Sequence, residues 1–149
     1  MTLAPLHLVY DVACDPEHAF TVWTTKLSTW WPRGHSVSQD PGTVVSLEPG
    51  VGGRLLETTP DGTEIVFGEI TAWDPPRSFS YRWHIGRDAS EATDVTLTFG
   101  AAPDGTTRLE VLQTGWERLG DDAASYREAN TGGWTALLPS YLRAVSSQV

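Results

Sequence analysis

The stretch Ser78-Phe-Ser-Tyr-Arg-Trp-His-Ile85 alternates large apolar side chains with polar ones, and this pattern decides the fold class. Successive side chains of a β-strand point to opposite faces, so Phe79, Tyr81 and Trp83 share one face with Ile85 while the polar residues occupy the other. A strand of this kind belongs to an antiparallel sheet that has one face in water. The apolar face of such a sheet needs a cover from another part of the chain.

Further segments with strand character flank this stretch on both sides. The gaps between them are short and rich in Gly, Pro and Asp, as in Pro60-Asp-Gly62 and Pro103-Asp-Gly105, which is typical of consecutive antiparallel hairpins. Besides 78–85, we expect strands at 6–12, 43–48, 54–58, 64–73, 94–99 and 108–113. The sequence therefore predicts a seven-stranded antiparallel sheet.

The cover is predicted near the C-terminus. Apolar residues recur there at the spacing of an amphipathic helix, and they are Trp134, Leu137, Leu138, Tyr141, Leu142 and Val145. Gly132-Gly133 costs about 1 kcal/mol per residue relative to Ala inside a helix, and Pro139 removes a backbone hydrogen bond. Two interpretations stay open, a kinked or broken helix and a helix held off the sheet to leave room beneath it.

Two short helices are predicted between the first two strands. Asp15 can serve as an N-cap with Pro16 at the first helical position, and apolar residues follow at helical spacing. A break is expected near Thr24-Thr25, and Pro32 ends the second helix because the residue before a proline disfavours helical geometry.

The composition limits the class of protein. A chain of 149 residues has the usual length of one domain, so we expect a single domain over 1–149. The net charge of −9 argues against nucleic-acid partners, which require clustered Lys and Arg. No apolar run approaches the roughly 20 residues of a membrane span. The N-terminal segment lacks the pattern of a secretion signal, so we expect a cytoplasmic protein, in which Cys14 is a small buried thiol.

Several patches spread over nearly the whole chain carry a family resemblance. They are Asp15-Pro-Glu-His-Ala-Phe-Thr-Val-Trp23, Trp30-Trp31, Pro49-Gly-Val-Gly-Gly-Arg54, Gly68-Glu-Ile-Thr-Ala-Trp-Asp-Pro-Pro-Arg77, Tyr81-Arg-Trp83, Val95-Thr-Leu-Thr-Phe99, Gln113-Thr-Gly-Trp116 and Gly133-Trp134 with Leu137 and Leu142. In this order they resemble the START/SRPBCC superfamily, and most of all its branch related to the activator of heat-shock protein 90 ATPase.

The resemblance implies an α+β helix-grip fold, in which a curved antiparallel sheet wraps around the long C-terminal helix and leaves a cavity between them. Members bind lipids, polyketides and other hydrophobic molecules, and some are cyclases, aromatases or hydrolases. The candidate ligand-binding residues are Trp30, Trp31, Phe67, Phe79, Tyr81, Trp83, Leu97, Trp116, Trp134, Leu138 and Tyr141. Simple core packing is the alternative for each of them, since aromatic side chains dominate protein cores.

The adjacent tryptophans Trp30 and Trp31 lie three and four residues after Leu27, so the three side chains flank one apolar stripe. We predict that one indole ring packs under the first helix and that the other reaches the mouth of the cavity.

Three residues are candidates for a polar catalytic group. His35 follows the tryptophan pair in a loop at the expected cavity mouth and could act as a base. Arg54 and Glu69 could pair or hold a ligand's carboxylate if both pointed inward, and the alternative is two exposed strand charges. No metal or cofactor is expected, because the histidines lack metal-ligand spacing and one cysteine cannot supply a zinc cluster.

Three functions stay open. The first is a soluble binding protein, monomeric or homodimeric, for a small hydrophobic ligand that is aromatic, polyketide-like or lipid-like. The second is a cyclase, aromatase or hydrolase that acts on such a molecule and requires a polar dyad inside the cavity. The third is a chaperone-regulating interaction module, which requires an exposed apolar patch.

Overall fold

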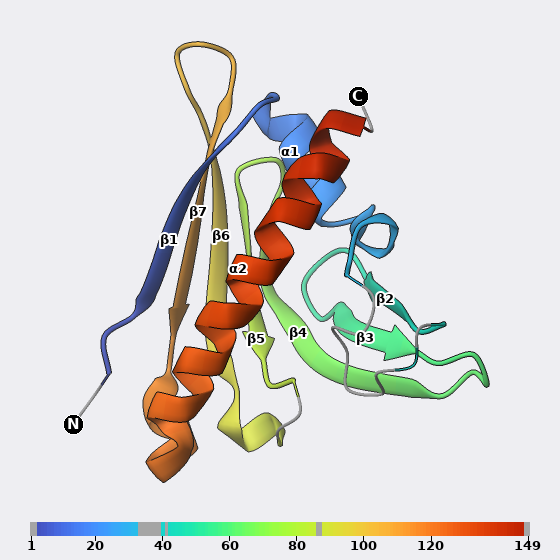
Figure 1. Ribbon diagram of the computed structural model, residues 1–149, viewed down its shortest axis with the longest axis vertical. Coiled ribbons are helices and arrows are strands. Elements are labelled where there is room, and N and C mark those ends of the chain that lie inside the picture. The colour runs from blue at the N-terminus through green and yellow to red at the C-terminus, as the bar shows by residue number, and fades with distance from the viewer. Residues whose placement is uncertain (1–2, 33–39, 41, 86–87, 148–149) are drawn as a thin grey trace.

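The computed structural model describes residues 3–32, 40, 42–85 and 88–147 of the chain. Their strands form one antiparallel sheet of seven strands in the order β1-β7-β6-β5-β4-β3-β2 (Figure 1). The strands are β1 (Leu6–Val12), β2 (Val44–Leu47), β3 (Arg54–Thr58), β4 (Glu64–Asp74), β5 (Ser78–Trp83), β6 (Thr93–Ala101) and β7 (Thr107–Thr114). The seven-stranded sheet and its meander are therefore confirmed, with boundaries that differ by at most two residues from those predicted.

The sheet is strongly curved because β4 carries irregularities at two places in its register. Leu55 of β3 pairs with Gly68 and Leu56 pairs with Val66, so the intervening Phe67 is an extra residue on β4. A second shift in register lies between Ile70 and Ala72 on the side that faces β5. Bulges of this kind bend a strand and increase its twist. Figure 1 shows β4 as a long bent strand that turns β3 and β2 away from the rest of the sheet.

Gly68, next to the first bulge, permits a close approach of two strands. A Cβ atom at this position would lie 2.5 Å from the carbonyl oxygen of Arg82 on β5. A side chain here would push the two strands apart, so the glycine is required by the bend itself.

The segment between β1 and β2 begins as predicted. Helix α1 (Pro16–Trp23) is capped by Asp15, whose carboxylate accepts a hydrogen bond of 2.9 Å from the backbone N–H of His18. It ends before Thr24, as expected. The second short helix is a single 3-10 turn, η1 (Leu27–Thr29), which is shorter than the sequence suggested.

The C-terminal helix α2 (Ala123–Ser147) is continuous through Gly132, Gly133 and Pro139, so the helix is not broken at these residues. Its buried side chains are Trp134, Leu137, Leu138, Tyr141, Ala144 and Val145. Burial of a large apolar stripe against the sheet outweighs the roughly 3 kcal/mol that an interior proline costs. Figure 1 shows α2 crossing the concave face of the sheet, with α1 beside its C-terminal end. Two further 3-10 helices, η2 (Ala89–Glu91) and η3 (Trp116–Asp122), precede β6 and α2.

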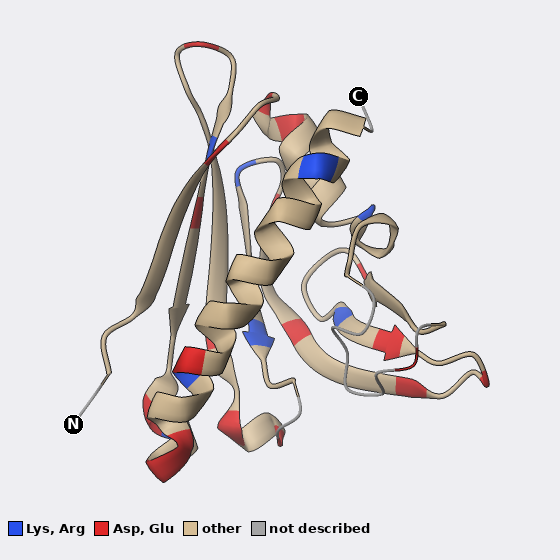
Figure 2. Cartoon of the chain, viewed as in Figure 1, with Lys and Arg blue, Asp and Glu red and all other residues tan. Residues whose placement is uncertain are grey.

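The alternation in β5 and β6 has the orientation that the sequence predicts. Phe79, Tyr81 and Trp83 are buried on the concave side, as are Val95 and Leu97 in β6, while the polar positions between them are half-buried or exposed. Figure 2 shows Lys and Arg as isolated segments along the chain instead of a continuous basic surface. In the part of the chain that is described, no helix is long and apolar enough to cross a membrane.

Candidate ligand-binding cavity

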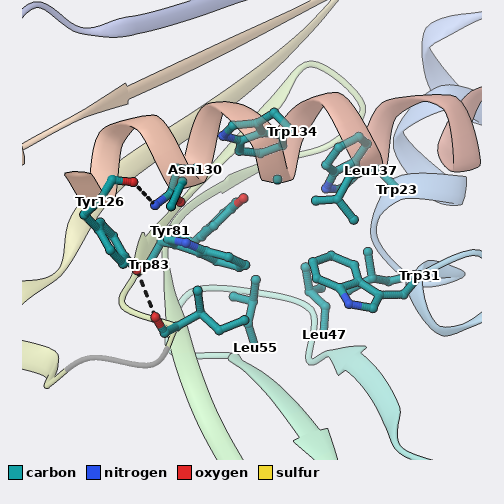
Figure 3. Close-up of a pocket in the computed structure, with 14 residues that line it drawn as sticks. Trp23, Trp31, Leu47, Leu55, Tyr81, Trp83, Tyr126, Asn130, Trp134 and Leu137 are labelled. Atoms are coloured by element: carbon teal, nitrogen blue, oxygen red, sulfur yellow. Dashed lines mark hydrogen bonds between the residues drawn. The ribbon is translucent and has the colours of Figure 1, made fainter. Parts of the chain in front are cut away.

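A cavity of about 320 Å³ lies between α2 and the concave face of the sheet (Figure 3). Four parts of the fold supply its wall. Trp23, Leu27 and Trp31 come from the segment between β1 and β2, Leu47 and Leu55 from β2 and β3, and Tyr81, Trp83 and Ile85 from β5 and the residues just after it. Helix α2 contributes Tyr126, Ala129, Asn130, Gly133, Trp134 and Leu137. Most of these side chains are apolar, as in sites for small hydrophobic molecules.

Aromatic rings line opposite sides of this cavity. Trp31 lies on one side, with its ring centroid 6.4 Å from that of Trp83. Tyr81 follows Trp83 on the same face of β5 at a centroid distance of 6.0 Å. On the helix side, the ring of Trp134 stacks on that of Trp23, with centroids 6.0 Å apart. A flat aromatic molecule in this space would meet rings from the sheet, the helix and the first connection.

A buried hydrogen-bond network orients the helix side of the wall. The indole Nε1 of Trp134 donates to Oε1 of the fully buried Gln113 at 2.9 Å. An indole nitrogen can only donate, so this bond places the Gln113 amide nitrogen on the other side. That nitrogen donates to Oγ1 of Thr93 at 2.9 Å and to Oδ1 of Asn130 at 3.3 Å. The amide nitrogen of Asn130 donates in turn to the carbonyl of Tyr126 at 2.8 Å.

The first turns of α2 are anchored to the end of β5 by Tyr126. Its hydroxyl group donates to the carbonyl oxygen of Ile85 at 3.0 Å, and both residues line the cavity. Figure 3 shows this bond and the bond from Asn130 to Tyr126 at one end of the site. The polar groups therefore gather at the end of the cavity near the start of α2, whereas Leu47, Leu137 and Trp31 form the opposite, apolar end.

Two donors on β5 lack a protein partner at this site. The Nε1 of Trp83 is buried and has no hydrogen-bond partner among the described residues. Tyr81 is 3% exposed, and its ring contacts Phe79 and Trp83, but its hydroxyl makes no hydrogen bond to another described residue. Burial raises the pKa of Tyr81 well above its ordinary value, so the phenol remains protonated. Figure 3 shows its oxygen directed toward Trp134 across the cavity.

Four of the predicted ligand-binding residues line the cavity, namely Trp31, Tyr81, Trp83 and Trp134. The other seven, Trp30, Phe67, Phe79, Leu97, Trp116, Leu138 and Tyr141, are buried in the core outside the lining. Phe67 supports the wall from behind, since its ring packs edge-on against Trp83 at 5.1 Å. The hydroxyl of Tyr141 donates to the carbonyl of Ala19 at 2.8 Å and so joins α2 to α1.

Most of the cavity wall on α2 was not predicted from the sequence. Tyr126, Asn130, Gly133 and Leu137 follow one another at spacings of four, three and four, so the apolar stripe from Trp134 could have been extended toward the start of α2. Strand β3 also carries a fully buried carboxyl group, Glu57, two residues beyond the cavity-lining Leu55. Its burial gave no signal in the sequence, because three consecutive residues of β3 are buried and strand alternation does not predict this.

Of the two alternatives for Arg54 and Glu69, the structure shows two strand charges outside the cavity and no pairing within it. The two residues are cross-strand neighbours in register, but Glu69 is exposed and the half-exposed Arg54 binds other carboxylates. Its guanidinium contacts Glu48 at 2.8 Å and Glu64 at 3.2 Å. Hydrogen bonds from the side chain and from the backbone N–H of Arg54 lower the pKa of Glu48 to about 2. Both strand charges face away from the cavity because Leu55, the neighbour of Arg54, takes the inward position.

The remaining catalytic candidate, His35, lies outside the described residues. Among residues that are described, no group of three or more His, Cys, Asp or Glu side chains could hold a metal ion. The thiol of Cys14 is half-buried, and desolvation together with Asp15 raises its pKa to about 11.

Comparison with known proteins identifies the family. A family profile described as "Activator of Hsp90 ATPase homolog 1-like protein" matches residues 4–146. The chain belongs to this family. Its membership and its helix-grip architecture confirm the resemblance to the START/SRPBCC superfamily. The comparison with curated proteins found no match.

Solved structures share the fold of this chain. A protein from Mesorhizobium loti superposes with a TM-score of 0.70 at 19% identity, over 98% of this chain and 99% of the other. The self-sacrificing resistance protein CalC from Micromonospora echinospora has a TM-score of 0.70 at 22% identity, over 97% and 95% of the two chains. The anthrahydroquino-γ-pyrone synthase Txn09, solved as a complex, is 33% identical with a TM-score of 0.59, over 86% and 87%.

Proposed function

We propose that this protein binds a small aromatic, polyketide-like molecule in the cavity between α2 and the sheet. The observation that carries the proposal is an apolar space of about 320 Å³ walled by the rings of Trp31, Trp83 and Trp134. Apolar walls with a few placed polar groups are what a site for a small hydrophobic molecule requires. The rings surround the space from three elements, so the site favours flat molecules over flexible acyl chains.

The family relationship supports an aromatic ligand. Txn09, which is 33% identical over most of both chains, is by its name a synthase of a fused-ring anthrahydroquinone compound. A molecule of this class is flat, largely apolar and edged with oxygen atoms. These properties correspond to an aromatic wall with its polar groups at one end.

Ring closure on such a molecule is a second candidate function, which the name of Txn09 favours. A cyclase would need groups that move protons or stabilise an oxyanion beside the bound chain. Tyr81, Trp83 and Asn130 are among the cavity residues that could donate a hydrogen bond in this way. Carboxylate and imidazole groups are absent from the described wall, so binding is the function better supported by the geometry.

Regulation of a chaperone has less support. The large exposed apolar residues are Val9, Val44, Val51, Val66 and Leu112. They belong to β1, β2, β4, β7 and a turn, and so they are spread over opposite edges of the sheet instead of one patch. Addition of the protein to heat-shock protein 90 should leave the rate of ATP hydrolysis unchanged, and a reproducible increase would favour this function after all.

Two adjacent glycines provide a test of the cavity as the binding site. Gly133 lines the cavity, whereas a side chain at Gly132 would meet no atom within 4 Å. Tryptophan fluorescence of the wild type should respond to at least one member of a panel of flavonoid, polyketide and fatty-acyl compounds. Gly133→Leu should weaken that binding by about tenfold or more, because the side chain occupies the site, while Gly132→Leu should leave it within about twofold.

Failure of every compound to bind would count against a binding role, and equal effects of the two substitutions would place the ligand elsewhere. Native mass spectrometry of freshly purified protein adds an independent readout, since a co-purifying molecule reports its own mass. A bound fatty acid would contradict the aromatic ligand while retaining the cavity as the site.

A further inference from the structure

Two hydrogen-bond donors at the polar end of the cavity indicate which chemical group a ligand should carry. Trp83 and Tyr81 project from the same face of β5, and both line the cavity. The indole N–H of Trp83 is buried without a protein acceptor. Buried polar groups in native proteins are almost always hydrogen-bonded, so an unpaired donor on a residue that lines the cavity indicates which group a ligand could bring.

Neighbouring polar groups of the described residues do not accept a hydrogen bond from Trp83. The carbonyl of Ile85 accepts from Tyr126, and the carbonyl of Trp83 itself accepts from Thr93 at 3.2 Å. The amide oxygen of Asn130 accepts from Gln113, whose own oxygen is bonded to Trp134. Each of these oxygens has a donor of its own, whereas the indole N–H of Trp83 and the phenol of Tyr81 have no acceptor among the described residues.

We propose that this end of the cavity selects ligands that carry a carbonyl or quinone oxygen, and that Tyr81 and Trp83 donate hydrogen bonds to it. The inference rests on the proposed aromatic ligand and adds its orientation: the oxygen lies at the β5 end and the fused rings extend toward Trp31 and Leu137. A hydrocarbon of the same shape fits the apolar part of the wall but leaves the donors unsatisfied. The site should therefore bind a flat molecule with a carbonyl oxygen more tightly than a hydrocarbon of the same shape.

A matched pair of probes isolates this oxygen. Fluorene and fluorenone share one planar tricyclic skeleton and differ by a single carbonyl group. Equilibrium dialysis gives the dissociation constant of each for the same protein. We expect the wild type to bind fluorenone about tenfold more tightly than fluorene, the effect of one or two hydrogen bonds made in a buried site.

Substitution of the donors should remove the preference. Tyr81→Phe deletes only the hydroxyl, and it should bring the ratio of the two constants to within about twofold of unity. Trp83→Phe also removes part of a ring, but that loss affects both probes, so the ratio still reports the N–H. We expect it to lower the ratio by about threefold.

Two residues outside the cavity serve as controls. The hydroxyl of Tyr141 and the indole nitrogen of Trp30 already donate to the backbone, to Ala19 and Val22. Tyr141→Phe and Trp30→Phe should therefore leave the preference for fluorenone unchanged, even where thermal unfolding shows reduced stability.

The outcomes separate this inference from the proposed function. Equal binding of both probes by the wild type would overturn the inference while the cavity remains the ligand site. A preference that survives both Tyr81→Phe and Trp83→Phe would also overturn it, because the selecting group would lie elsewhere. Binding of neither probe would overturn the inference together with the proposed aromatic ligand.

Discussion

Trp30 and Trp31 are neighbours in the chain with ring centroids 6.0 Å apart, yet only the ring of Trp31 lines the cavity. Trp30 is 5% exposed, and its indole nitrogen donates to the carbonyl of Val22 at 2.7 Å. Its ring packs against Tyr141 at 5.3 Å. The irregular turn after η1 thus divides the pair between the core under α1 and the wall of the cavity.

Replacement of each tryptophan by alanine should have a different effect. Trp30→Ala should lower the free energy of unfolding by about 3–5 kcal/mol, because it leaves a large hole in the core. Trp31→Ala should cost about 1 kcal/mol but weaken binding of fluorene by about tenfold. Urea unfolding and equilibrium dialysis measure the two effects. Similar losses of stability with intact binding would mean that both rings are core.

Gln113 should stabilise the fold through the groups that it pairs. Gln113→Leu would leave the indole of Trp134 and the amide oxygen of Asn130 without their partners, at a cost of about 3 kcal/mol in the free energy of unfolding. Binding of fluorene should weaken as well, since both residues form the wall. The adjacent Leu112 is 41% exposed, so Leu112→Ala is a suitable control with a small effect. A fully stable Gln113→Leu protein would show that the network is dispensable.

Replacement of Gly132 by alanine should stabilise the protein. It lies inside α2, and a Cβ atom at this position would meet open space. Gly132→Ala should raise the free energy of unfolding by about 1 kcal/mol, because alanine loses less conformational freedom on folding. Gly50 is a useful contrast, since its φ of 94° lies in the left-handed region that disfavours side chains. Gly50→Ala should therefore destabilise the protein, and a gain in stability there would contradict this assignment.

The ion pair of Glu48 with Arg54 predicts a dependence of stability on pH. Folding lowers the pKa of Glu48 from 4.5 to about 2. A carboxyl group with a depressed folded pKa stabilises the protein above its unfolded pKa, and this contribution disappears as pH falls through the folded value. The stability advantage of the wild type over Glu48→Gln should thus be present at pH 6 and decline between about pH 4.5 and 2.

Chemical unfolding at a series of pH values measures this difference. Arg54→Gln should reduce the same pH-dependent contribution, because it removes the charged partner of Glu48 while the backbone N–H of residue 54 still donates to that carboxylate. Added salt should also reduce it, since both side chains are close to half-exposed. A difference between wild type and Glu48→Gln that is constant with pH would exclude the ion pair as its cause.

Much of the fold could be predicted from the sequence, because local patterns reflect local structure. The alternation in 78–85 located β5 and its buried face, and the turn residues located the ends of the hairpins. Asp15 and Pro16 marked the start of α1. The continuity of α2 was not predictable, because the local cost of Pro139 is offset by packing against a sheet formed by distant residues.

The candidate site also combines features that follow from the sequence with features that depend on the tertiary structure. The sequence by itself determined that aromatic side chains such as Tyr81 and Trp83 cover one face of the sheet, since strand periodicity sets that face. Only the tertiary structure decided that Trp31 reaches the cavity while Trp30 does not, that Asn130 joins its wall, and that Arg54 points away. These outcomes depend on an irregular turn, a strand bulge and a buried hydrogen-bond network, whose partners lie far apart along the chain. No local periodicity encodes such contacts.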